Sequence, residues 1–82
     1  MNEKIKKVLE VFNKNKLNVA KIAKWDKNTF LVYAYEKDPH EPNPFYLCDN
    51  VTFKTKCVSS GNNYLKIENA LTNNLVYSKE EQ

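Results

Sequence analysis

The chain has 82 residues and a net charge of +3, and 41% of its residues are hydrophobic. This length predicts a single domain over residues 1–82, with a core too small to enclose a large cofactor. All 13 basic residues are lysines. Because arginine supplies the commonest contact to guanine, its absence argues against sequence-specific reading of the major groove.

Two kinds of targeting segment are not visible in the sequence. No apolar run approaches the roughly 18 residues that a membrane span needs. The first residues are rich in lysine and lack the apolar stretch of a signal peptide. We therefore expect a cytoplasmic protein that does not enter a membrane.

The first predicted element is a helix. Apolar residues recur at helical spacing from Ile5 to Phe12 and draw one apolar stripe. Asn2 is of a residue type that caps helix N-termini. The helix is expected to end within residues 13–16, where asparagine and lysine alternate.

Two strands are expected next. Residues 17–25 fit either a helix or a strand, and we favour a strand because the turn signal at residues 26–28 and a strong strand follow. Residues 29–36 predict the second strand, and its residues 30–35 are apolar or aromatic on both sides, which is typical of a central strand. On the first strand, one side would carry Leu17, Val19, Ala23 and Trp25.

The three prolines, Pro39, Pro42 and Pro44, lie close together around the only histidine, His40. Proline fixes φ and removes a backbone donor, so this segment cannot be helical or central in a sheet. It predicts a stiff, exposed loop. Loops held on rigid elements often carry function.

The rest of the chain predicts two short strands and a helix. The strands cover residues 45–48 and 53–58, and the helix begins near Tyr64 and ends at residues 73–74. Residues 75–77 are an apolar tail expected to dock on the core. The predicted fold is α+β: an antiparallel sheet of three to four strands in the order α-β-β-β-β-α, with both helices on one face.

Cys48 and Cys57 are the only cysteines. Their spacing matches no zinc pattern, which needs four ligands. If the segments around them pair as a hairpin, a disulfide is geometrically possible. The alternative is that both are small buried hydrophobic residues.

No catalytic or metal site is predicted. Asp38, His40 and Glu41 are metal-capable, but flanking prolines splay them apart and no fourth ligand is near. His40 is the only candidate base for a nucleophile. We therefore expect a protein that is not an enzyme and has no cofactor.

Our first functional hypothesis is the binding of another protein. A stiff loop lowers the ordering cost of binding, and aromatic residues are common interface anchors. The residues expected to contact the partner are Pro39, His40, Glu41, Pro42, Asn43, Phe45 and Tyr46.

Two alternatives remain open. Lysines and strand aromatics can bind double-stranded RNA or single-stranded nucleic acid by charge and stacking. The residues for that role are Lys21, Lys24, Lys27, Lys54, Lys56, Tyr33 and Tyr35. The third hypothesis is a structural subunit of a larger assembly, with homo-oligomers formed through the apolar sides of residues 30–35.

Two resemblances to known proteins add expectations. Residues 43–49, Asn-Pro-Phe-Tyr-Leu-Cys-Asp, followed by a strand and a helix, are similar to small phage and prophage proteins of Gram-positive bacteria. That resemblance implies a viral or mobile-element origin, with the bacterial host cytosol as the location, and it implies no known activity. For such a phage-type protein, our hypothesis of protein binding names a host enzyme or defence component as the partner. Residues 29–75 also resemble double-stranded-RNA-binding domains, with Pro39-His40 matching their Pro-x-His loop. This second resemblance implies a helix, a three-stranded antiparallel sheet and a helix in that order along the chain, and it implies RNA binding.

Overall fold

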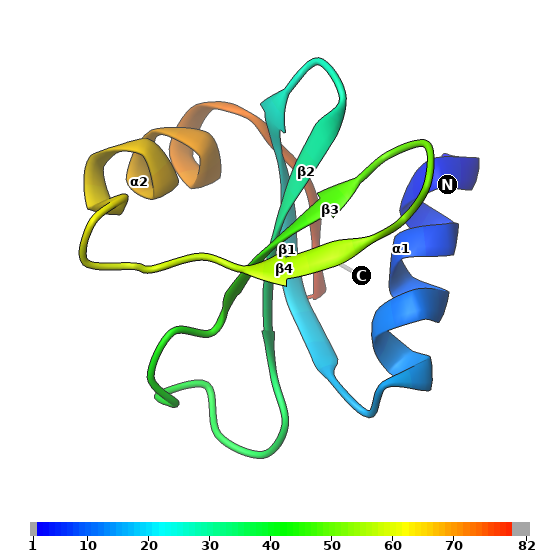
Figure 1. Ribbon diagram of the computed structural model, residues 1–82, viewed down its shortest axis with the longest axis horizontal. Coiled ribbons are helices and arrows are strands. Elements are labelled where there is room, and N and C mark those ends of the chain that lie inside the picture. The colour runs from blue at the N-terminus through cyan, green and yellow to red at the C-terminus, as the bar shows by residue number, and fades with distance from the viewer. Residues whose placement is uncertain (1, 80–82) are drawn as a thin grey trace.

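A five-stranded antiparallel sheet forms the centre of the protein, whose computed structural model describes residues 2–79 (Figure 1). The strand order across the sheet is β4-β3-β2-β1-β5. The α+β class is thus confirmed, but the sheet has five strands and not three to four. In chain order the elements are α1 (Glu3–Lys14), β1 (Asn18–Asp26), β2 (Thr29–Tyr35), β3 (Phe45–Asp49), β4 (Thr55–Cys57), α2 (Tyr64–Asn73) and β5 (Leu75–Ser78).

Helix α1 forms where the apolar spacing predicts it. The Asn2 side chain accepts a hydrogen bond from the backbone N–H of Lys4 at 2.7 Å, which satisfies one of the free donors of the first turn. The helix buries Ile5, Val8 and Phe12 against one face of the sheet. The sheet residues in this first core include Ile22, Phe30, Val32, Ala34 and Cys48.

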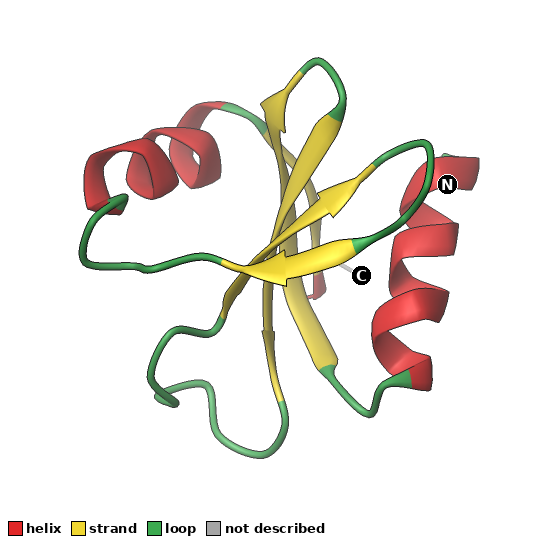
Figure 2. Ribbon diagram, viewed as in Figure 1, coloured by secondary structure: helices red, strands yellow, loops and turns green. Residues whose placement is uncertain are grey.

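Helix α2 packs on the opposite face. Its buried residues Ile67 and Ala70 share a second core with Ala23, Leu31 and Val58. The sheet therefore lies between the two helices (Figure 2). The prediction that both helices cover one face is wrong, because the central strand β2 is apolar on both sides and each side needs its own cover.

Strand β1 is confirmed as a strand, but its sides differ from the prediction. Its pairing with β2 is irregular between Val19 and Lys21. This bulge shifts the alternation, so that Val19 and Ile22 join the first core and Ala23 joins the second. Val19 and Ala23 therefore do not share a side.

The apolar tail is a fifth strand. Residues 75–78 pair antiparallel with β1, and the N–H of Lys24 donates to the carbonyl oxygen of Asn74 at 2.9 Å. This strand accounts for the difference in strand number. It also makes β2 the middle strand of the sheet, as predicted.

Strand β4 is shorter than the predicted segment 53–58. Asp49 accepts hydrogen bonds from the N–H groups of Val51 and Thr52 at 2.8 Å, and Phe53 takes a positive φ of 61°. The chain is therefore still turning at Phe53 and becomes a strand only at Thr55. All residues of β4 are exposed.

The cysteines are both free thiols. Cys48 lies opposite Thr55, and Cys57 lies opposite Tyr46, so the two cysteines do not face each other directly. Cys48 is buried, and burial together with the Asp49 carboxylate raises its pKa to about 11. Cys57 is exposed.

Candidate functional site

The proline-rich loop between β2 and β3 is held in one conformation by its own acidic side chains. The Glu41 carboxylate accepts hydrogen bonds from the backbone N–H groups of Glu36, Lys37 and Asp38 at 3.2, 3.0 and 3.2 Å. Asp38 accepts one from the N–H of His40 at 2.9 Å. These bonds favour the charged form of Glu41 and lower its pKa.

Two further contacts attach the loop to the rest of the fold. The hydroxyl of Tyr33, on β2, donates to the carbonyl oxygen of Pro39 at 2.9 Å. The side-chain oxygen of Asn43 accepts from the N–H and the hydroxyl of Ser60, at 3.3 and 2.9 Å. Asn43 has a positive φ of 50°, a conformation that asparagine tolerates better than most residues. The loop is therefore tied to the sheet and to the segment before α2.

The seven residues predicted to contact a partner have different roles in the structure. Pro39, His40 and Pro42 are exposed. Glu41 and Asn43 bond within the protein, as described above. Phe45 and Tyr46 lie on opposite faces of the sheet because they are neighbours on strand β3.

Phe45 and Tyr46, at the start of β3, therefore pack against different aromatic rings of the protein. Tyr46 packs edge-on against Phe12 of α1, with ring centroids 5.5 Å apart. Phe45 lies on the other face, 5.2 Å from the Tyr33 ring. Only Phe45 is on the same face as Tyr33, which holds the loop.

A cavity of about 480 Å³ opens beside the loop. The lining residues are Ala20, Lys21, Tyr33, Tyr35, Pro39 and Lys79. The rings of Tyr33 and Tyr35 are 6.1 Å apart in an edge-to-face arrangement. Burial raises the pKa of Tyr33, and the neighbouring Tyr35 and Asp38 raise it further. We call the exposed Pro39, His40 and Pro42, together with Lys21, Tyr33 and Tyr35, the loop–tyrosine surface.

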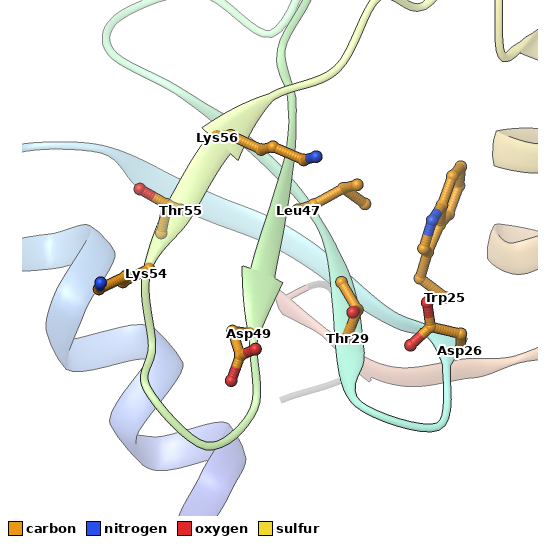
Figure 3. Close-up of a pocket in the computed structure, with 8 residues that line it drawn as sticks. All are labelled: Trp25, Asp26, Thr29, Leu47, Asp49, Lys54, Thr55 and Lys56. Atoms are coloured by element: carbon orange, nitrogen blue, oxygen red, sulfur yellow. The ribbon is translucent and has the colours of Figure 1, made fainter.

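The residues predicted for nucleic-acid binding do not lie together on one surface of the protein. Lys21 shares the cavity with Tyr33 and Tyr35. Lys54 and Lys56 line a different cavity beside β4, together with Trp25 (Figure 3). Lys24 is exposed opposite Phe30, and Lys27 lies in the turn between β1 and β2.

Sequence reasoning missed Ala20 and Lys79 as cavity residues. Ala20 reaches the cavity at the β1 bulge, which has no clear sequence signal. Lys79 follows β5 directly, and that strand was not predicted. Recognition of the apolar run at residues 75–77 as a strand would have placed Lys79 at this end of the sheet.

The metal-capable side chains of the loop do not converge on a common point. His40 is exposed, and Asp38 and Glu41 use their carboxylates on their own loop. Among residues 2–79 there is no cluster of three metal-capable side chains. Within the same range, neither helix is long and apolar enough to cross a membrane.

No family model, no curated protein and no solved structure matches the chain.

The loop should loosen at acid pH. Because the folded-state pKa of Glu41 is lowered, its hydrogen bonds contribute stability above its ordinary pKa and lose that contribution as pH falls through the lowered value. We expect the backbone amides of Glu36, Lys37 and Asp38 to shift together in an NMR titration, with a midpoint below the ordinary glutamate value. The Glu41→Gln variant should lack this transition. A midpoint at or above the ordinary value would contradict the arrangement.

Proposed function

We propose that this protein is a non-enzymatic binding module that recognises another protein through the loop–tyrosine surface. One observation carries the proposal: the loop is irregular and exposed, yet it is held by hydrogen bonds that the side chains of Glu41, Asp38 and Asn43 accept and that the Tyr33 hydroxyl donates. A loop that is already ordered loses little conformational entropy on binding. It presents Pro39, His40 and Pro42 beside a half-buried aromatic cavity.

The surroundings of the surface favour a protein partner over nucleic acid. Tyrosine rings and prolines supply the apolar area typical of interface centres. The charges around them are mixed, since Lys21 and Lys79 line the cavity while Glu36 and Asp38 are exposed on the loop. A phosphate backbone would meet these carboxylates as well as the lysines.

The resemblance to phage proteins suggests where the partner is found. The segment that carries this resemblance, residues 43–49, contains the whole of β3 and Asn43, whose side chain attaches the loop to Ser60. The motif therefore belongs to the scaffold, while the exposed loop residues precede it. On this resemblance we propose that the partner is a bacterial host enzyme or defence component in the host cytosol.

Affinity capture with paired baits tests the proposal. The tagged protein and its His40→Ala/Tyr35→Ala variant would be incubated with nuclease-treated lysate of a Gram-positive bacterium. We expect one discrete protein on the first bait and a loss of most of it on the second, because truncation of interface anchors costs about 2 kcal/mol or more each.

The matched control is Tyr64→Ala, which removes an exposed tyrosine outside the surface (61% exposed). That bait should retain the partner. Equal retention by the His40→Ala/Tyr35→Ala bait, or the recovery of nucleic acid alone from an untreated lysate, would refute the proposal.

Nucleic-acid binding remains the second candidate, on the observation that Lys21 lies with Tyr33 and Tyr35 around one cavity. Such binding must weaken steeply as salt rises, because counterions are released from the phosphates. A structural subunit is the third candidate. The apolar residues Leu31, Val32 and Ala34 are already buried within one chain, so self-association would have to use other surfaces.

A further inference from the structure

The free edge of β4 has backbone hydrogen-bonding groups that point out of the sheet. At one end of the β3–β4 ladder, the carbonyl oxygen of Lys54 accepts from the N–H of Asp49 at 2.9 Å. At the other end, the N–H of Val58 donates to the carbonyl oxygen of Phe45 at 3.0 Å. Lys56 lies midway between Lys54 and Val58. Because bonded and non-bonded pairs alternate along an antiparallel ladder, the N–H and C=O groups of Thr55 and Cys57 face away from β3.

Two lysines, Lys54 and Lys56, flank Thr55 on this edge. The sequence from residue 50 to residue 67, which includes β4 and the first turn of α2, contains three lysines and no acidic residue. Lys54 extends away from β3, and Lys56 extends toward Trp25 (Figure 3). Lys66 of α2 lies over the ring of Trp25 on β1, with its Nζ 4.4 Å from the ring centroid, so this third lysine is on the far side of the sheet from the β4 edge.

A cavity of about 440 Å³ lies next to the same edge. Leu47 and Trp25 supply its apolar part, and Lys56 reaches over Leu47 (Figure 3). Two carboxylates also line it, but both serve the turns in which they lie. Asp26 accepts the N–H of Asn28 at 2.9 Å, and Asp49 accepts the N–H groups after β3, as described above.

We infer that β4 receives an extended acidic segment of a partner protein as an additional edge strand. The backbone of that segment pairs with Thr55 and Cys57, and its acidic side chains on the α2 side lie beside Lys54 and Lys56. The same lysines oppose the pairing of two β4 edges, because like charges would then lie across from each other. An acidic segment therefore fits the edge better than a second copy of the chain.

This site is separate from the loop–tyrosine surface. Different residues form the two, so variants of one leave the other intact and the two proposals can fail independently.

Two synthetic peptides test the inference on the full chain. One is a capped octapeptide of alternating valine and glutamate, and the other alternates valine and lysine. We expect the glutamate peptide to bind, to shift the fluorescence of Trp25, the only tryptophan, and to slow amide exchange at Thr55 and Cys57. The lysine peptide should bind at least about tenfold more weakly.

Charge reversal gives the second readout. The Lys54→Glu/Lys56→Glu variant should lose at least about tenfold in affinity for the glutamate peptide and gain affinity for the lysine peptide. The control Lys6→Glu/Lys14→Glu, with both changes at exposed positions of α1, should behave as the parent does. Three results would each overturn the inference: no binding of either peptide, equal binding of both, or binding without protection of the Thr55 and Cys57 amides.

Discussion

Replacement of Phe12 by alanine is expected to cost about 3–5 kcal/mol of folding free energy. Phe12 is 2% exposed, fills the first core beneath α1 and contacts the Tyr46 ring edge-on. Small domains are stable by only roughly 5–15 kcal/mol in total, so this loss is a large part of the whole. The melting temperature should fall by at least about 12 °C. Thermal and urea denaturation followed by circular dichroism measure both quantities.

The Phe12→Leu variant is the control for this prediction. It keeps most of the buried volume and should lose clearly less stability than Phe12→Ala. A loss of under about 1 kcal/mol for Phe12→Ala would contradict the first core as described. At temperatures where the variant remains folded, partner capture should persist, because the loop–tyrosine surface is built on the other face of the sheet.

The second large effect is expected at Leu31, in the middle strand. Leu31→Ala should cost about 2–5 kcal/mol, because the side chain is 0% exposed and lies in the core beneath α2. The matched control is Leu65→Ala, the same chemical change at a position that is 80% exposed. That change should stay within about 0.5 kcal/mol. The difference in urea midpoint between the two variants measures the contribution of burial.

This comparison also tests the two-sided architecture. If both helices covered one face, Leu31 and Val32 could not both be fully shielded by the same layer, since successive strand residues point to opposite faces. Both residues are 0% exposed. Equal losses for Leu31→Ala and Leu65→Ala would contradict the second core.

Local features of the fold were predictable from local sequence. The stripe from Ile5 to Phe12 and the cap at Asn2 lie within one helix, so they need no distant partner to be read. The turn at residues 26–28 also formed as expected, with Asp26 accepting the N–H of Asn28. Features that depend on distant partners were missed. Residues 75–78 are a strand because β1 offers them an edge, and nothing in their own short apolar run distinguishes a strand from a docked tail.

In the candidate site, too, the local features were predictable from the sequence and the features that depend on distant contacts were not. The stiffness and exposure of the proline loop follow from Pro39, Pro42 and Pro44, because proline restricts the backbone wherever it occurs. The internal role of Glu41 was not predicted, since it requires the loop to fold back so that three N–H groups point at one carboxylate. Tyr46 was predicted to contact a partner beside the loop, and the structure shows that the alternation of β3 turns its ring toward Phe12.

The sequence by itself determined the helices, most of the strands and a rigid, exposed loop, because these depend on hydrophobic spacing and on proline within a few neighbouring residues. Only the tertiary structure decided that the helices cover opposite faces and that Lys21, Tyr35 and Pro39 share a cavity. It also decided which backbone groups of β4 are left free. The physical reason is that faces and free edges are set by register and bulges between strands, which are properties of paired segments and not of any one segment.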